Sequence, residues 1–134
     1  MPVVDASVWV AINRDTDPAH SRCMAWLDSV LDSNDRLVAP TLLVAEVAGA
    51  LRKLTRQQAV ASAVVEELFA LGAVELIPLD RERARRAAAL AAASGVRGAD
   101  AVYLALAQEL VENLVTLDRL QAEQGAKLVE IRTP

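Results

Sequence analysis

Short apolar segments alternate along this chain with longer stretches that have helical hydrophobic spacing. Strands are predicted at residues 3–4, 36–39, 74–79, 114–116 and 127–132. Helices are predicted at residues 7–12, 18–31, 42–53, 55–71, 80–94, 99–112 and 118–124. Strands separated by helices are joined by right-handed crossovers, which place helices on both faces of a parallel sheet. The sequence therefore predicts an α/β fold.

Local signals set the expected helix boundaries. Asp17 followed by Pro18 predicts the capped start of the second helix. Thr55, with Gln58 three residues later, has the capping-box pattern for a helix that Gly72 would end in the left-handed conformation. These signals make the helix ends specific predictions.

The patterning continues through all 134 residues, so we expect residues 1–134 to form one domain with a substantial hydrophobic core. The most apolar stretch, residues 37–51, is broken by Pro40 and Glu46, and we expect no membrane association. No basic leader precedes the first strand, so a cytoplasmic protein is expected. The single cysteine, Cys23, is predicted to be a small buried hydrophobe.

The chain has a net charge of −4 and a sequence pI of about 5.0, which gives no general attraction to polyanions. A basic run from Arg81 to Arg86 lies on a predicted helix opened by Asp80. It either presents a patch or solvates an outer helix face. Aromatic residues are only 3% of the chain, and Trp9, Trp26, Phe69 and Tyr103 all lie in apolar helical patterns that predict core packing.

Four carboxylates occupy unusual positions. Asp5 and Asp118 follow predicted strands, and Asp100 lies in the first turn of the helix that leads into the fourth strand. Parallel sheets bind ligands beyond the carboxyl ends of their strands, where these three acids would lie. Glu46 interrupts a helix that is otherwise apolar nearly all round, so its side chain is expected to project inward.

Each acid also has a structural explanation. Asp5 and Asp118 would cap helices, Asp100 would sit favourably at a helix amino terminus, and Glu46 would pair with a nearby basic residue. The candidate basic partners are Arg52, Lys53 and Arg97. If the four acids converge, each pair about 4 Å apart repels by roughly 4 kcal/mol at an effective dielectric near 20, and a divalent cation would relieve the repulsion.

An all-oxygen donor set favours Mg²⁺ or Mn²⁺ over Zn²⁺, and such a site suits phosphoester hydrolysis. A two-histidine mechanism is impossible because His20 is the only histidine. The chain has no glycine-rich loop of the Gly-Lys-Ser/Thr kind, which excludes nucleotide hydrolysis by that route.

The acidic segments resemble those of one known family. They are Val4-Asp5-Ala6-Ser7, Glu46 in its apolar helix, the run from Gly98 to Ala107, and Val115-Thr116-Leu117-Asp118. In order and spacing these segments are similar to the PIN-domain ribonucleases, especially the VapC-type toxins of toxin–antitoxin pairs. The resemblance implies a PIN-like three-layer sandwich with a five-stranded parallel sheet ordered 3-2-1-4-5. It also implies a homodimer and Mg²⁺- or Mn²⁺-dependent endoribonuclease activity.

Carried over by this resemblance, Asp5, Glu46, Asp100 and Asp118 are the expected catalytic and metal-binding acids, with Ser7 and Thr116 as supporting hydroxyls. Water held on the metal would cut the RNA and leave a 5′-phosphate and a 3′-hydroxyl. A VapB-like antitoxin would occupy the groove in a higher toxin–antitoxin complex. Arg97 is the best candidate for a phosphate contact, and an ion pair with the acids is equally consistent with its position. The alternative is a PIN-like module that binds RNA or a partner without catalysis.

Overall fold

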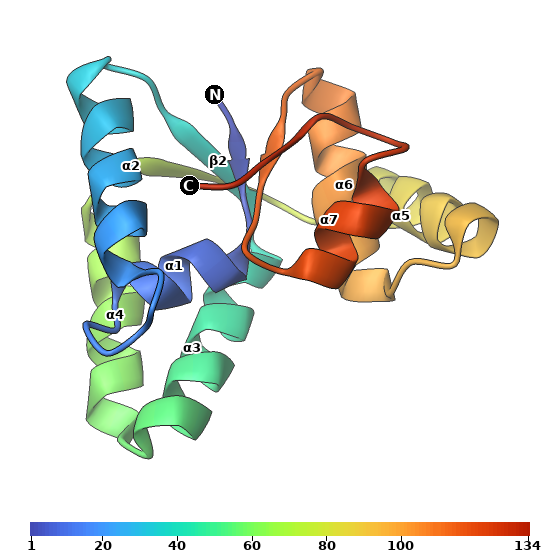
Figure 1. The fold of residues 1–134 in the computed structure, drawn as a ribbon. Coiled ribbons are helices and arrows are strands. Elements are labelled where there is room, and N and C mark those ends of the chain that lie inside the picture. The colour runs from blue at the N-terminus through green and yellow to red at the C-terminus, as the bar shows by residue number, and fades with distance from the viewer.

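A five-stranded parallel sheet lies at the centre of the computed structural model, which describes residues 1–134. The strands are β1 (Val3–Val4), β2 (Leu37–Pro40), β3 (Val74–Ile77), β4 (Leu114–Val115) and β5 (Ile131–Arg132). Their order across the sheet is β3-β2-β1-β4-β5, which confirms the predicted α/β fold and strand order. Figure 1 shows that β1 runs from the amino terminus toward α1.

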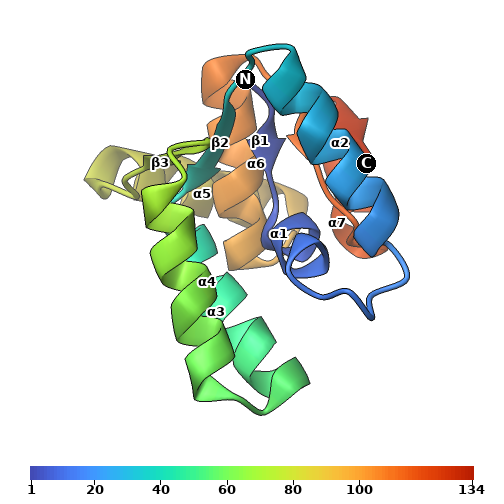
Figure 2. The same cartoon turned by 90° about the vertical axis from the view of Figure 1, so that its left-hand side faces the viewer.

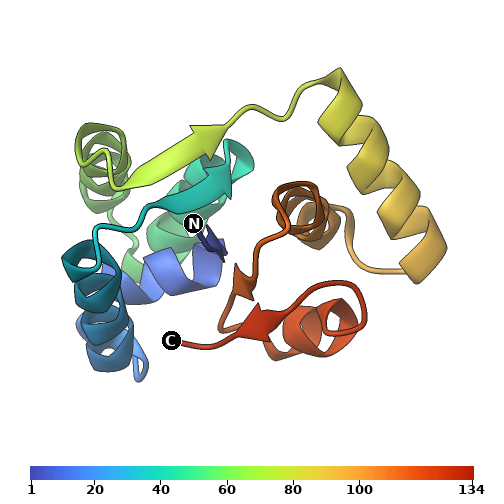
Figure 3. The ribbon, with the colours of Figure 1, turned by 90° about the horizontal axis from the view of Figure 1, so that it is seen from above.

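Seven helices flank the sheet. They are α1 (Ala6–Ile12), α2 (His20–Asp32), α3 (Leu42–Thr55), α4 (Gln58–Ala70), α5 (Arg81–Ser94), α6 (Gly98–Leu110) and α7 (Arg119–Gly125). Helices α1 to α4 gather on one side and α5 to α7 on the other, as the views in Figures 2 and 3 show. The predicted three-layer arrangement is therefore present.

The central strands are apolar because both faces of the sheet are covered. Val3, Val4, Leu37 and Leu114 have no exposed surface. This burial explains why these strands read as continuous hydrophobic runs rather than as alternating patterns. The core also contains Cys23, as the sequence predicted.

The register of the central strands places two site residues side by side. Val4 of β1 is level with Val115 of β4. The Asp5 amide donates to the Val115 carbonyl at 2.9 Å, so Asp5 and Thr116 leave the sheet together at its carboxyl edge. This edge is where parallel sheets bind ligands.

Two predicted helix starts are wrong. The side chain of Asp17 accepts a hydrogen bond from the Ala19 amide at 2.8 Å, and this local turn delays the start of α2 to His20. Thr55 is the last residue of α3, where its hydroxyl donates to the Leu51 carbonyl and accepts from the Gln57 amide, and α4 begins only at Gln58 with Gln57 as its N-cap. Gly72 does adopt the predicted left-handed conformation, with φ of 58°.

Strand β5 is much shorter than predicted. Residues Leu128 and Val129 fold back instead, and both of their amides donate to the carbonyl of Gly125 after α7. Strand β3 likewise ends at Ile77, one residue before Pro78, because proline has no amide hydrogen for the ladder. Hydrophobic runs alone did not reveal these turns.

The predicted core positions of the aromatic residues are partly correct. Trp9 and Tyr103 are buried, and Trp26 packs partly buried against the core. Phe69 is wrong, since it lies on the outer face of α4 with 61% of its surface exposed. Helix α4 is apolar on more faces than the core covers, so periodicity did not distinguish its inner face from its outer face. None of the helices in the structure combines the length and apolar character needed to cross a bilayer.

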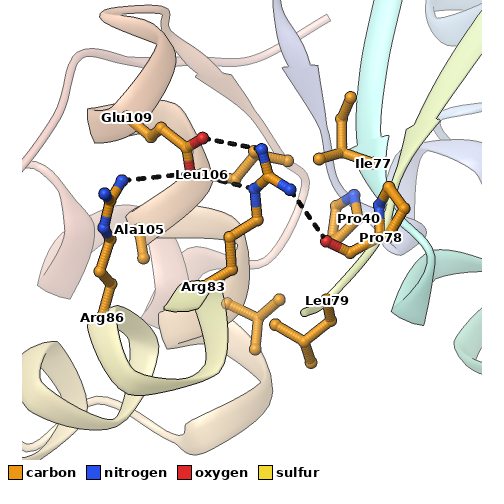
Figure 4. A pocket seen from close by; sticks show the side chains of 10 residues that line it. Pro40, Ile77, Pro78, Leu79, Arg83, Arg86, Ala105, Leu106 and Glu109 are labelled. Atoms are coloured by element: carbon orange, nitrogen blue, oxygen red, sulfur yellow. Dashed lines mark hydrogen bonds and ion pairs between the residues drawn. The ribbon is translucent and has the colours of Figure 1, made fainter. Parts of the chain in front are cut away.

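The basic run on α5 has a third role that was not predicted. Arg83 donates two hydrogen bonds to the carboxylate of Glu109 on α6, at 2.9 and 3.1 Å, and Arg86 lies 3.6 Å from the same group (Figure 4). Two members of the run therefore tie α5 to α6. The hollow beside them holds only about 10 Å³, the volume of roughly one water.

Candidate functional site

A polar cleft of about 540 Å³ opens at the carboxyl edge of the sheet. Its lining includes all four predicted acids, Asp5, Glu46, Asp100 and Asp118. They come from four separate parts of the fold: the end of β1, the middle of α3, the first turn of α6 and the start of α7. In Figure 1 this edge lies at the bottom of β1, where α1 begins between α3 and the lower ends of α6 and α7.

Asp5 is the most constrained of the four acids. It is buried, and it caps α1 by accepting a hydrogen bond from the Ser7 amide at 3.0 Å. The hydroxyl of Ser7 donates to the same oxygen, Oδ2, and the hydroxyl of Thr116 lies 3.2 Å from it. The helix-cap explanation is therefore correct, and the cap also fixes the orientation of an acid that lines the cleft.

The two hydroxyls also organise the loop after β4. Ser7 Oγ accepts a hydrogen bond from the Leu117 amide, and Thr116 Oγ1 accepts one from the Asp118 amide, each at 3.0 Å. Asp118 then caps α7 by accepting from the Gln121 amide at 3.0 Å. Ser7 and Thr116 thus hold Asp5 and the backbone of Asp118 in one hydrogen-bonded unit.

Arg97 bridges the two remaining aspartates. Its Nε donates to Asp100 Oδ2 at 3.0 Å, and a terminal nitrogen donates to Asp118 Oδ2 at 3.2 Å. The ion pair anticipated from the sequence is therefore present, while the guanidinium-bearing side chain stays 64% exposed. This cation lowers the repulsion between two acids that face the same cleft.

Glu46 has a partner that the sequence did not suggest. The hydroxyl of Tyr103, a fully buried side chain on α6, donates to Glu46 Oε1 at 2.7 Å. Glu46 forms no ion pair with Arg52, Lys53 or Arg97, so the alternative structural explanation of this residue is not supported. The spacing of Tyr103 three residues after Asp100, which puts both on one face of α6, was the available signal.

Electrostatics mark two of the acids as unfavourably charged. Burial raises the pKa of Glu46, and the nearby Asp5 and Asp100 raise it further, against the lowering effect of the Tyr103 hydrogen bond. Burial also raises the pKa of Asp100, despite the opposing effect of Arg97. The charged form of both carboxylates is therefore disfavoured chiefly by burial and to a smaller degree by the neighbouring acids.

The chemistry of this donor set fits a hard cation, because every candidate ligand is a carboxylate or hydroxyl oxygen. In the present side-chain arrangement no three His, Cys, Asp or Glu residues are grouped closely enough to hold a metal ion. The acids are engaged instead by Ser7, Thr116, Tyr103 and Arg97. A cation would therefore draw Asp100 and Asp118 away from Arg97.

Sequence reasoning missed a basic residue in the cleft. Arg22, at the start of α2, lines the cleft, and Figure 1 shows α2 on the opposite side of the fold from α6 and α7. Its side chain is exposed and has no ion-pair partner, whereas Arg14 nearby pairs with Asp17 at 3.6 Å. Since Arg97 is engaged by two acids, Arg22 is the free cation among the cleft-lining residues.

Comparison with protein families matches residues 3–127 to the PIN domain. Because the match spans most of the chain, this protein belongs to the PIN domain family. A comparison with curated protein sequences gave no significant match.

Several solved structures share the fold. Mycobacterium tuberculosis VapC20, described as a sarcin-ricin loop cleaving toxin, is 17% identical with a TM-score of 0.79, over 98% of this chain and 99% of that one. A toxin–antitoxin complex from Klebsiella pneumoniae is 18% identical with a TM-score of 0.72, over 100% and 98% of the two chains. PAE2754 from Pyrobaculum aerophilum is 22% identical with a TM-score of 0.69, over 96% and 81%. At these identities the similarity establishes the fold.

Proposed function

We propose that this PIN-domain protein is a metal-dependent endoribonuclease that acts as the toxin of a type II toxin–antitoxin pair. One observation carries the proposal: the four predicted acids, from separate elements, line a single cleft at the carboxyl edge of the sheet, together with a fifth carboxylate, Asp17. Bringing these acids together is costly unless they bind a cation, because burial and mutual repulsion raise the pKa of Glu46 and Asp100. The structural similarity to toxins of known toxin–antitoxin systems supports the biological role.

The proposed cofactor is Mg²⁺, with Mn²⁺ as a substitute, held by Asp5, Glu46, Asp100 and Asp118. When bound, such a cation stabilises charge on a phosphodiester and makes water a stronger nucleophile. The acids supply the negative charge, and the protein donors around them restrict their rotation. Ser7 and Thr116 fix Asp5, and Tyr103 fixes Glu46.

Arg97 and Arg22 are the proposed contacts for the RNA backbone. Arg97 neutralises Asp100 and Asp118 when no other cation does so, and its exposed guanidinium becomes available to phosphate once those acids have another partner. Arg22 needs no such exchange, because it has no carboxylate to release. An RNA strand lying in the cleft would then meet a cation on each wall, which offsets the overall charge of −4.

The proposed assembly is a homodimer bound by a VapB-like antitoxin. The similar structure from Klebsiella pneumoniae is a toxin–antitoxin complex, which supports an antitoxin partner. An antitoxin that covers the cleft would keep RNA from the acids. A cytoplasmic location is proposed with this role, since RNA and the partner would meet the chain there.

Growth on expression without a partner tests the biological role. The wild-type chain is expected to slow growth, and Asp100→Asn is expected to be tolerated at the same expression level. Asp28→Asn, which changes an exposed acid of α2 outside the cleft, is the matched control and should remain toxic. A folded wild-type chain that cells tolerate would contradict the toxin role and favour a non-catalytic PIN-like binding module.

A further inference from the structure

A buried glutamine lies directly behind the hydroxyl that contacts Asp5. The side chain of Gln121, on α7, is only 1% exposed. Its Oε1 lies 2.8 Å from Thr116 Oγ1, while its Nε2 is buried with no hydrogen-bond partner. Gln121 does not line the cleft, so it would act on the site only through its neighbours. A buried polar side chain with an unpaired donor is costly and requires an explanation.

The hydroxyl of Thr116 has one proton and, besides the more distant Ser7 Oγ at 3.4 Å, two close candidate acceptors. Asp5 Oδ2 lies 3.2 Å from Thr116 Oγ1, and Gln121 Oε1 lies 2.8 Å from it. The Asp118 amide already donates to the same hydroxyl at 3.0 Å. If the proton points to Gln121, the oxygen of Thr116 faces the carboxylate of Asp5 without a donor between them. Two electron-rich oxygens would then be in contact.

A half-turn of the Gln121 carboxamide removes the contact between the two oxygens and gives Nε2 an acceptor. The amide nitrogen and oxygen exchange places within the same volume, and their positions follow from the hydrogen-bond network. In this orientation Nε2 donates to Thr116 Oγ1, and the single proton of Thr116 points to Asp5 Oδ2. The buried nitrogen gains an acceptor and Asp5 has its third hydrogen bond, while Oε1 takes the buried position without a partner, which a carbonyl oxygen tolerates better than an amide does.

We propose that Gln121 is a positioning residue for Asp5, acting through Thr116. The Ser7 amide, the Ser7 hydroxyl and the Thr116 hydroxyl would all donate to Oδ2. Oδ1 has no protein donor, so this arrangement leaves one defined oxygen of Asp5 for a cation in the cleft. The inference rests on the proposed metal-dependent function. Groups that orient a metal ligand through a hydrogen bond typically change metal affinity by 10- to 100-fold.

Gln121→Met tests the proposal because methionine has a similar length and shape but cannot donate. The affinity for Mn²⁺, measured by titration calorimetry without RNA, is expected to weaken by about tenfold. The stability of the metal-free protein should change little, because the lost hydrogen bond to Thr116 is offset by the removal of a buried amide that has an unpaired polar atom. Gln124→Met is the matched control, since Gln124 lies on the same helix, also has a buried unpaired polar atom, and has no hydrogen bond to the site.

A second variant keeps the test decisive if Gln121→Met fails to fold. Thr116→Val removes the hydroxyl at nearly constant volume and should weaken Mn²⁺ binding to a similar degree. When both variants fold, Gln121→Met should weaken Mn²⁺ binding little further in the Thr116→Val background, because the two residues act through one hydroxyl. Mn²⁺ affinity within twofold of wild type in Gln121→Met, or in Thr116→Val, would overturn the proposal.

Measuring Mn²⁺ affinity tests the role of Gln121 separately from the proposed nuclease activity. A wild-type chain that binds Mn²⁺ but cuts no RNA would contradict the nuclease. Weakened binding in Gln121→Met would still support the positioning role in that case. A wild-type chain that binds no Mn²⁺ would overturn both the metal site and the role of Gln121.

Discussion

Tyr103→Phe is expected to destabilise the metal-free protein through a single lost hydrogen bond. Phenylalanine retains the ring that packs in the core and removes only the hydroxyl, which donates to Glu46 at 2.7 Å. A buried hydrogen bond to a charged acceptor contributes about 1.5–3 kcal/mol. Scaling the average unfolding entropy to 134 residues makes each kcal/mol worth roughly 3.5 °C, so we expect Tm to fall by about 5–10 °C.

The assay is thermal unfolding without metal at pH 7, in wild-type and Glu46→Gln backgrounds. Glutamine can still accept a hydrogen bond but is neutral, so Tyr103→Phe should cost only about 1 kcal/mol there. The difference between the two backgrounds isolates the part of the interaction that depends on the charge of Glu46. It also reports whether the carboxylate is ionised in the absence of a metal.

Two results would refute this reasoning. A fall in Tm of less than about 2 °C would mean that the hydroxyl and the carboxylate are not bonded in solution. An equal fall in both backgrounds would mean that the negative charge of Glu46 does not strengthen the contact. The first result would remove Tyr103 as the residue that fixes Glu46 in the cleft, and the second would refute a charged Glu46 as its acceptor.

Three further predictions concern other parts of the chain. Because burial raises the pKa of Asp100 above its ordinary value of 3.8, the folded state binds that proton more tightly than the unfolded state, and stability falls as pH rises through the interval between the two values. Asp100→Asn should therefore make the metal-free protein more stable at pH 7, with the advantage lost below about pH 4, and a pH-independent difference in denaturant unfolding would contradict the argument. In the Asp100→Asn background, Arg22→Ala should weaken RNA binding and reduce the slope of log affinity against log salt concentration by about one. Arg36→Ala, outside the cleft, should leave this slope unchanged. Equal slopes for the two variants would refute a phosphate contact by Arg22. Val111 ends α6 in the left-handed conformation, with φ of 56° and 91% exposure. Val111→Gly should therefore raise the free energy of unfolding by about 1 kcal/mol, whereas Val111→Ala should not. A destabilised glycine variant would show that the left-handed conformation carries no strain.

Much of the fold could be predicted because its signals are local and periodic. The buried strands β1, β2 and β4 read directly as apolar runs, and the acids after them mark the edge of the sheet. Errors arose where a side chain altered a boundary. The Asp17 side chain forms a turn that delays α2, and Thr55 ends α3, with its hydroxyl bonded to both Leu51 and Gln57, instead of serving as the N-cap of α4. Such choices depend on competing hydrogen bonds that residue type alone does not decide.

The acids of the site could be predicted, but their partners could not. The positions of Asp5 and Asp118 follow from strand ends, whereas the Glu46–Tyr103 bond joins residues 57 positions apart on different helices. Gln121 gave no signal because a glutamine on a short helix is usually solvated, and its burial arises from the packing of α7. Arg22 could not be predicted because its position in the cleft depends on the loop after α1, which brings the start of α2 there.

The central claim is that the four acids support metal-dependent cutting of RNA. The most direct measurement is to incubate the partner-free chain with a pool of tRNA and rRNA, with Mg²⁺, with Mn²⁺ or with a chelator, beside Asp100→Asn, and to map the new 5′ ends. We predict discrete cuts bearing 5′-phosphates that require metal and disappear in the variant. Cuts that persist in chelator, or that Asp100→Asn makes equally well while folded, would contradict the account.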